Sequence, residues 1–291
     1  MKMILIVNPN SGTKNSKEQL IKAIAIFNKY GHQTEIYITQ CQNDAYYFLK
    51  NTKNKFDVVC VFGGDGTINE VTSALIKKKD RPLIGYFPSG TMNDFGSNFD
   101  LDENWEMIAE RICRGKYKEF DVGKFGDHRY FNYVAAFGAL TNVSYTTKRD
   151  SKEKFGTLAY IFEGISRLTE IKPVPVKIKI NGKEKNYKVL FALVFSGGRV
   201  AGTELVSKRK SSVNDGEFNV MIVDYVDAPV TSAPDLLRTV AEQKKYIHWY
   251  KASEMEFEFE NNIDWTIDGE KAPVNKKVKI TNINKALRML S

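Results

Sequence analysis

A glycine-rich turn that carries a single carboxylate, GGDGT at residues 63–67, is the stretch of this sequence with the clearest chemistry. Five apolar residues, 58–62, precede it, and Ile68, Val71 and Leu75 follow it at helical spacing. This pattern predicts a buried strand, a tight turn and a helix. Amide groups at the start of such a helix attract anions, and glycines let a phosphate approach the backbone. The turn is therefore a candidate phosphate-binding site.

Asp65 decides which chemistry this turn can support. A carboxylate beside a phosphate is repelled unless a divalent cation or a ribose hydroxyl lies between them. An ordinary Asp-Gly turn is the alternative interpretation, because this dipeptide is common in turns. Thr67 and Glu70 have the spacing of a capping box, which predicts that the helix begins at Thr67.

Two further loops place glycines and hydroxyl groups in front of predicted helices. The first is NPNSGTKN at 8–15, which lacks the upstream glycine of a Walker A motif, and the other is PSGTMNDFG at 88–96. Thr91 and Asp94 again have capping-box spacing, so the amides of Gly90 and Thr91 can point at an anion, with Asn93 and Asp94 on the first helical turn. Ordinary helix caps are the alternative for either loop.

Repeated strand–helix units position these loops within the first 120 residues. We expect strands at 3–7, 35–39, 58–62 and 83–87, and helices at 17–30, at 44–50, from Thr67, and around Trp105, Ile108 and Ile112. Such repeats imply a parallel sheet covered on both faces. Because ligands of these sheets bind at the carboxyl ends of the strands, the three loops should meet at one edge.

The sequence changes to an antiparallel β pattern after about residue 118. Two hairpins are predicted, one of strands 119–124 and 129–136 and one of strands 174–180 and 185–195 across Asn181-Gly182. Further strands are expected at 217–223, 254–260, 264–267 and 277–281, and a helix at 156–171. We therefore predict an α/β nucleotide-binding domain over 1–125 and a β-rich domain over 126–281, with the tail 282–291 packing back on the first.

Composition and charge fit a soluble globular protein of 291 residues, with 42% hydrophobic and 27% charged residues. The net charge of +8 comes from short, dispersed basic clusters, which suit either a solvated surface or an anionic membrane surface. Nucleic acid is not expected as a partner, because no motif interleaves aromatic and basic residues. Three cysteines without metal spacing suit a reducing cytosol. The longest apolar run, 189–195, is too short to cross a bilayer.

The order of the motifs resembles the diacylglycerol kinase catalytic family, and most closely its soluble bacterial lipid kinases. The matching segments are NPNSG at 8–12, GGDGTINEV at 63–71, PSGTMNDF at 88–95, FDVGK at 120–124 and DGE at 268–270. NAD kinases share the GGDGT segment, but the GTMND and DGE segments speak against an NAD kinase. The resemblance implies an α/β domain that binds ATP and a β-sandwich domain, with a lipid entering between them.

The resemblance also implies roles for individual residues. The nucleotide would be lined by Asn8, Ser11, Gly64, Asp65, Gly66, Thr67, Gly90 and Thr91. Mg2+ and its waters would be held against the phosphates by Asp65, Asp94 and Asp121, in keeping with the oxygen ligands that Mg2+ prefers. Glu270 would accept the proton of the lipid hydroxyl, and Asp65 and Glu270 would be the catalytic residues.

A second motif and one departure qualify this picture. Asn214-Asp215-Gly216-Glu217 matches a family motif that holds a structural Mg2+, which here implies Asp215 with backbone oxygens of Ser212 and Glu217. A plain turn entering a strand is the alternative. Gly96 and Ser97 stand where the family often has Ala-Arg, so a basic residue expected near the phosphates is missing.

The sequence thus predicts an ATP- and Mg2+-dependent kinase that phosphorylates diacylglycerol to phosphatidic acid. Three alternatives stay open: a kinase of another lipid alcohol such as phosphatidylglycerol, sphingosine or a polyprenol, an NAD kinase, and a non-catalytic nucleotide-binding regulator. We expect a cytoplasmic protein that associates peripherally with an anionic membrane surface. A homodimer is left open.

Overall fold

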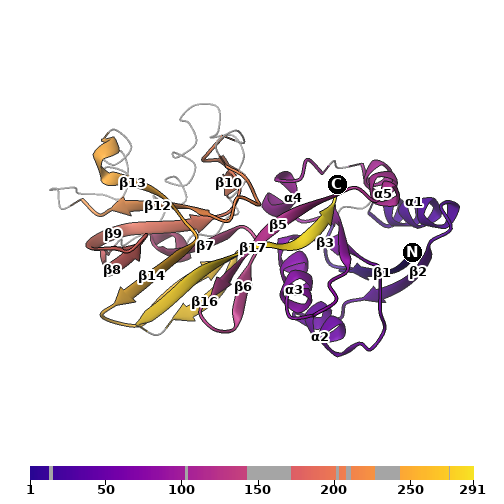
Figure 1. Cartoon of the computed structure of the whole chain (residues 1–291), viewed down its shortest axis with the longest axis horizontal. Coiled ribbons are helices and arrows are strands. Elements are labelled where there is room, and N and C mark those ends of the chain that lie inside the picture. Colours follow the sequence, from indigo (N-terminus) through magenta and orange to yellow (C-terminus); the bar gives the residue numbers. More distant parts are fainter. Residues whose placement is uncertain are drawn as a thin grey trace. The chain divides into compact units, whose positions relative to one another are not determined.

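The computed structural model describes residues 1–12, 16–101, 104–142, 172–200, 203–207, 211–226, 243–274 and 276–291. The helix predicted over 156–171 lies outside these ranges. The chain forms two compact units, Met1–Val122 with Ile283–Ser291, and Gly123–Asn282 (Figure 1). That these units are separate domains with a boundary near residue 125 stays a prediction.

The first unit is built on a parallel sheet with the strand order β4-β3-β1-β2. Its strands are β1 (Lys2–Val7), β2 (Gln33–Ile38), β3 (Val58–Gly63) and β4 (Leu83–Pro88). Its helices are α1 (Ser16–Lys29), α2 (Asp44–Asn51), α3 (Asp65–Leu75), α4 (Asp94–Ser97) and α5 (Trp105–Arg114). The predicted alternation of strands and helices is therefore confirmed.

Apolar periodicity explains why these segments fold as they do. Every residue of β3 is buried, as expected for a central strand of a parallel sheet. One side of the sheet packs against Phe27 of α1 and against Trp105, Ile108 and Ile112 of α5. Each such fully buried large side chain contributes about 1.5–3 kcal/mol relative to exposure. The buried sheet therefore gives the loops at its edge a rigid base.

Both predicted capping boxes are wrong. Helix α3 begins at Asp65 and not at Thr67, and Gly64 is its N-cap residue. The Glu70 carboxylate instead accepts the backbone N–H groups of Asn43, at 2.8 Å, and Ala45, at 3.1 Å, at the start of α2. A local spacing rule could not foresee this, because the side chain serves a helix that is distant in sequence.

The second unit is an antiparallel assembly. Its sheet order is β16-β15-β7-β9-β8-β14-β17, with β12 paired to β9 and β13 to β12. The chain enters it within β5 (Tyr117–Phe125) and leaves it within β17 (Lys277–Leu290). The other elements are β6 (Arg129–Phe131), β7 (Val134–Gly138), η1 (Ala139–Asn142), β8 (Val174–Ile180), β9 (Lys183–Phe195), β10 (Arg199–Val200), β11 (Thr203–Glu204), β12 (Phe218–Asp224), η3 (Lys244–Tyr246), β13 (Ile247–Ala252), β14 (Glu254–Phe259), β15 (Ile263–Ile267) and β16 (Glu270–Val274).

The antiparallel sheet folds over onto a shared core. Trp265 of β15 lies 5.1 Å from Phe257 of β14, ring centroid to ring centroid, although β7, β9 and β8 separate the two strands in the sheet order. Phe125 and Phe137 also contact Trp265. Two inner faces therefore pack against each other, which agrees with the β-sandwich predicted from the resemblance.

The turns of this unit show where sequence signals succeed and fail. Asn181 and Gly182 have φ of 52° and 76°, the left-handed values that a two-residue hairpin requires, so this predicted hairpin is confirmed. The hairpin predicted from strands 119–124 and 129–136 is confirmed by the antiparallel pairing of β5 with β6, but its second strand is interrupted between β6 and β7. Strand β17 is longer than predicted, because it continues to Leu290 and pairs with β4 through Met289 and Ile84.

Candidate active site

Three loops meet at the carboxyl edge of the parallel sheet, as predicted. The backbone N–H of Ser89 donates to the Gly63 carbonyl at 3.0 Å, and the Ser11 and Ser89 hydroxyls lie 2.9 Å apart. The Asn8 amide donates to the Thr67 hydroxyl at 3.0 Å. These bonds join residues 8–11, 63–67 and 88–91 into one polar surface within the first unit.

Two glycines let the loops cross backbone against backbone. A Cβ atom placed on Gly90 would lie 2.8 Å from the Gly64 Cα, and one placed on Gly64 would lie 3.1 Å from the Gly90 Cα. Real Cβ atoms essentially never approach a neighbour within 3.0 Å, so a side chain at Gly90 would push the loops apart. The two loops therefore need glycine at this crossing, because a side chain would collide with the backbone of the other loop.

The third loop is closed by Asn93, a residue to which sequence analysis gave no role. Its side-chain oxygen accepts the Gly90 N–H at 2.8 Å, and its amide nitrogen donates to the Gly90 carbonyl at 2.8 Å. Asn93 has φ of 51° and is the N-cap residue of α4, so Asp94 is the first helical residue. The Gly90 amide is thus directed at Asn93, whereas Thr91 is exposed. The tolerance of asparagine for left-handed backbone was the available signal.

Asp65 lies between two helix starts. It is the first residue of α3, and its carboxylate accepts the backbone N–H groups of Asp94, at 3.2 Å, and Phe95, at 3.3 Å, at the start of α4. The Tyr86 hydroxyl is buried nearby, and burial, followed by the charge of Asp65, raises the pKa of Tyr86 well above its usual value. The negative charge of Asp65 is therefore held in a defined place by backbone donors.

The other two predicted metal-binding carboxylates are buried in the same unit. Asp94 is 2% exposed and Asp121 is 1% exposed. The chain segments that carry them meet through the rings of Phe95 and Phe120, whose centroids are 5.3 Å apart. Asp121 also accepts the Lys285 N–H at 2.7 Å.

The three carboxylates do not form a metal site made by protein side chains alone. Within the described residues, no three His, Cys, Asp or Glu side chains converge as an all-protein metal cage. Mg2+ is commonly bound through one or two carboxylates, several waters and substrate phosphates. Carboxylate oxygens are of the kind that Mg2+ prefers, so binding of Mg2+ by Asp65, Asp94 and Asp121 together with a nucleotide stays a prediction.

Glu270 lies in the second unit, at the first position of β16. It is exposed and follows a two-residue turn whose Asp268 and Gly269 have φ of 46° and 87°. The sequence predicts that its carboxylate approaches Asp65 and Asp94, and this stays a prediction.

The turn before Glu270 is fixed by a buried carboxylate. Asp268 is 5% exposed, and its carboxylate accepts the backbone N–H groups of Asn132, at 2.7 Å, Tyr133, at 3.1 Å, and Val134, at 3.0 Å. These bonds interrupt the strand predicted over 129–136. Three donors on one buried carboxylate exceed what an ordinary surface turn requires.

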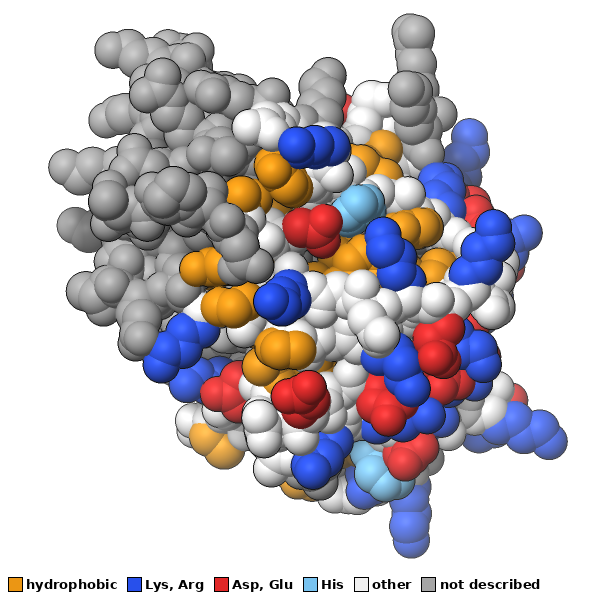
Figure 2. Space-filling view, turned by 90° about the vertical axis from the view of Figure 1, so that its left-hand side faces the viewer, with side chains coloured by type: hydrophobic (Ala, Val, Ile, Leu, Met, Phe, Trp, Pro, Cys, Tyr) orange, Lys and Arg blue, Asp and Glu red, His pale blue; other side chains and the backbone are white. Residues whose placement is uncertain are grey.

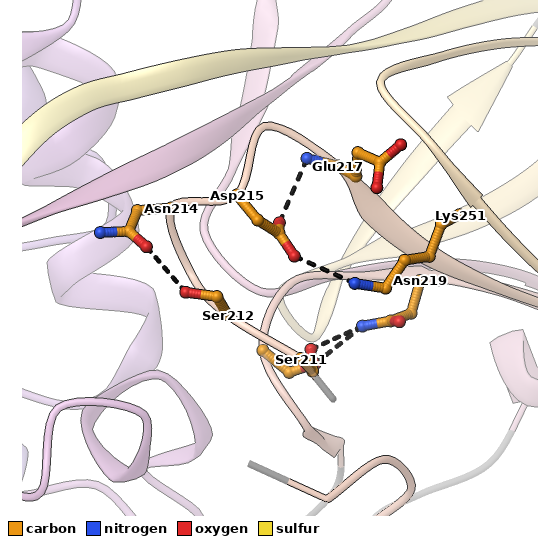
Figure 3. A network of polar contacts seen from close by, with 8 residues as sticks. Ser211, Ser212, Asn214, Asp215, Glu217, Asn219 and Lys251 are labelled. Carbon is orange, nitrogen blue, oxygen red and sulfur yellow. Dashed lines mark hydrogen bonds and ion pairs between the residues drawn. The ribbon is translucent and has the colours of Figure 1, made fainter. Parts of the chain in front are cut away.

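At the predicted structural metal site, Asp215 and Ser212 contact other groups of the chain (Figure 3). Asp215 accepts the Glu217 N–H at 3.2 Å and the Lys251 ammonium at 3.1 Å. The Ser212 hydroxyl donates to the Asn214 side chain at 2.7 Å. The one predicted acidic ligand is therefore already paired with a cation from the chain itself.

Comparisons with known proteins show which proteins this chain is similar to. A model of the family "Diacylglycerol kinase catalytic domain" matches residues 2–125. The "Diacylglycerol kinase" of Bacillus subtilis (strain 168) is 30% identical over 270 residues, which cover 91% of this chain and 88% of that protein. The "Diacylglycerol kinase" of Staphylococcus aureus (strain MRSA252) is 31% identical over 278 residues, which cover 93% and 87%. A crystal structure of a diacylglycerol kinase from Bacillus anthracis str. Sterne has the same fold, with a TM-score of 0.79, 24% identity and coverage of 99% of this chain and 96% of that one.

Proposed function

This chain belongs to the diacylglycerol kinase family, and from this premise we propose that it transfers the γ-phosphate of ATP to the hydroxyl of diacylglycerol to give phosphatidic acid. The family makes it a lipid kinase, and the identity of the lipid is the proposed part. The printed names of its relatives support diacylglycerol. The observation that carries the proposal is the surface formed by three loops around Asp65 at the sheet edge.

The nucleotide is proposed to lie on that surface. Phosphates would approach the backbone amides at the start of α3, and the close approach of Gly64 and Gly90 keeps side chains out of the way. The proposed contacts are made by Asn8, Ser11, Gly64, Asp65, Gly66, Thr67, Gly90 and Thr91. Asp65, Asp94 and Asp121 would hold Mg2+, which when bound neutralises charge on the transferring phosphate.

Glu270 is proposed as the general base. Its carboxylate accepts the hydroxyl proton as the hydroxyl oxygen bonds to the γ-phosphorus. The bond from the γ-phosphorus to the bridging oxygen of ADP breaks in the same transfer, so ADP leaves with the electron pair. Asp268 supports this role by fixing the turn that precedes Glu270. Phosphoryl transfer depends mainly on such positioning and on charge stabilisation.

An anionic membrane surface is the proposed partner, because the substrate resides in a bilayer and the net charge is +8. In the described part of the chain, no helix is long and apolar enough to cross a membrane. We propose peripheral association from the cytoplasm.

A phosphorylation assay tests the substrate. The protein is incubated with radiolabelled ATP, Mg2+ and, in separate reactions, diacylglycerol, phosphatidylglycerol, sphingosine, a polyprenol or NAD. We expect label in phosphatidic acid. Label in another acceptor would replace diacylglycerol, and nucleotide binding without any transfer would indicate a regulator.

Glu270→Gln tests the base, because it keeps the size of the side chain and removes its basicity. We expect turnover to fall by roughly 100-fold or more, with unchanged ATP affinity in equilibrium binding. Glu258→Gln, a surface substitution on β14, is the control and should retain full turnover. If Glu270→Gln weakens ATP binding and leaves turnover at saturation intact, Asp121 becomes the next candidate.

A further inference from the structure

We infer that the Lys251 ammonium, and not a divalent metal ion, is the cation that neutralises Asp215 and fastens the turn at residues 212–217 to strand β13. The motif at 214–217 predicts a structural Mg2+, so the inference concerns a departure of this chain from the pattern of its motif. It does not depend on the proposed lipid substrate, because all of the residues concerned lie in the second unit, whereas Asp65 and its loops belong to the first.

Both oxygens of the Asp215 carboxylate have donors. One accepts the Glu217 N–H at 3.2 Å, and the other accepts the Lys251 ammonium at 3.1 Å. Figure 3 shows the two groups on opposite sides of the carboxylate. The separation of 3.1 Å between the Lys251 nitrogen and the Asp215 oxygen is that of a hydrogen-bonded ion pair.

The fold brings Lys251 to this position. Strands β12 and β13 are paired with Lys251 directly opposite Asn219, and the turn that carries Asp215 leads into the start of β12. The backbone of Lys251 is also held, because its carbonyl accepts the Asn181 side chain at 2.9 Å. The contact thus follows from strand register and not from a chance encounter of two long side chains.

Side chains around the turn also have partners within the chain. Ser211 donates to the Gly197 carbonyl, and Asn219 donates to Ser211 at 2.7 Å and to the Gly197 carbonyl at 3.0 Å. Ser212 donates to Asn214 at 2.7 Å. A divalent ion at Asp215 would meet the positive charge of Lys251 with a single carboxylate to balance both. The donor set therefore does not fit Mg2+ but fits an ammonium group.

The first test measures metal binding directly. Crystals of the full chain are grown with Mn2+, whose anomalous scattering marks its sites, and thermal unfolding without nucleotide is compared in EDTA and in Mg2+. We expect no anomalous peak at Asp215 and the same unfolding midpoint in both solutions. A peak on the Asp215 carboxylate, or a Mg2+-dependent rise in the midpoint that Asp215→Asn abolishes, would overturn the inference.

The second test measures how much the ion pair between Asp215 and Lys251 stabilises the protein. Because half-exposed ion pairs are weak, Lys251→Met and Asp215→Asn should each lower the unfolding midpoint by about 1–3 °C, and the double variant should lose no more than either single one. The charge swap, Asp215→Lys with Lys251→Asp, should recover part of the loss. An unchanged midpoint in Lys251→Met, or additive losses in the double variant, would show that the ammonium does not fasten the turn.

Discussion

At the scale of single residues, Asp65 holds the start of α4 and is also proposed to hold Mg2+. Its carboxylate is the acceptor for two backbone N–H groups at the start of α4. A carboxylate held in this way is pre-oriented before any ligand arrives, so little reorganisation is needed when charge develops near it. This makes the charge of Asp65, more than its size, the property to vary.

Asp65→Asn should abolish most of the activity while the fold survives. The amide keeps the shape but removes the negative charge, so turnover at saturating substrates should fall by about 100- to 1,000-fold. The free energy of unfolding, from denaturant titration, should fall by about 1 kcal/mol because one acceptor for the α4 N–H groups is lost.

Asp44→Asn is the matched control for this change. The Asp44 carboxylate also accepts a backbone N–H, that of Gln40 at 2.7 Å, and it lies at the start of α2. We expect a similar loss of stability with full turnover. If Asp65→Asn and Asp44→Asn behave alike in the kinase assay, Asp65 has no chemical role.

At the scale of elements, sequence periodicity predicted most of the fold, because burial of apolar faces determines it. The uniformly apolar β3 and the Asn181-Gly182 hairpin were therefore identifiable. The capping boxes at Thr67 and Thr91 were wrong because tertiary contacts decide which side chain meets which backbone group. Glu70 serves α2, and Asn93 serves its own loop. Likewise, no local signal pairs Asp215 with Lys251.

The crossing of the two glycine loops can be tested with Gly90→Ala. The new methyl would meet the Gly64 backbone, which cannot yield as a flexible side chain could. We expect ATP affinity to fall at least 10-fold in equilibrium binding, because the proposed phosphate surface is pushed open. Gly126→Ala has open space around it and a positive φ, so it should cost about 1 kcal/mol of stability and leave ATP affinity unchanged. Equal ATP affinity in both variants would contradict this account.

The turn before Glu270 can be tested with Asp268→Asn. Asparagine suits the left-handed turn equally well, so only the charged acceptor of three N–H groups is lost. We expect the free energy of unfolding to fall by about 2–4 kcal/mol. Hydrogen exchange at residues 132–134 should accelerate, whereas exchange in β3 should change only through the global loss. Unchanged exchange at 132–134 would show that the carboxylate does not hold this segment.

At the scale of the whole molecule, charge is spread over the surface. Figure 2 looks onto the second unit and shows Lys and Arg side chains interspersed with Asp and Glu. Some charged side chains of the second unit form surface ion pairs, such as Lys177 with Glu258 and Lys279 with Glu254. Attraction to a membrane would therefore arise from the net charge of +8 and be sensitive to salt.

Activity on vesicles should rise with the anionic lipid content and fall with ionic strength. Each basic residue close to an anionic surface contributes about 1 kcal/mol, and salt screens this attraction within a Debye length of about 10 Å at 0.1 M. The measurement is initial rate on diacylglycerol vesicles with increasing phosphatidylglycerol, at low and high NaCl. Detergent micelles without anionic lipid are the control. Equal rates on neutral and anionic vesicles at both salt concentrations would refute this expectation.

Strand β17 makes the first unit depend on residues 283–291, which are synthesised after the other residues of that unit. Its last residues complete the first unit: Met289 pairs with Ile84, Leu290 lies in the core, and the Arg81 guanidinium donates to the Ala286 carbonyl at 2.7 Å. The loops at the sheet edge are therefore synthesised long before the segment that covers the edge of β4. A released chain truncated after residue 282 should accordingly be cut by protease within residues 83–122, and the chain of 291 residues should resist. Protection of the first unit from proteases would therefore depend on residues Ile283–Ser291.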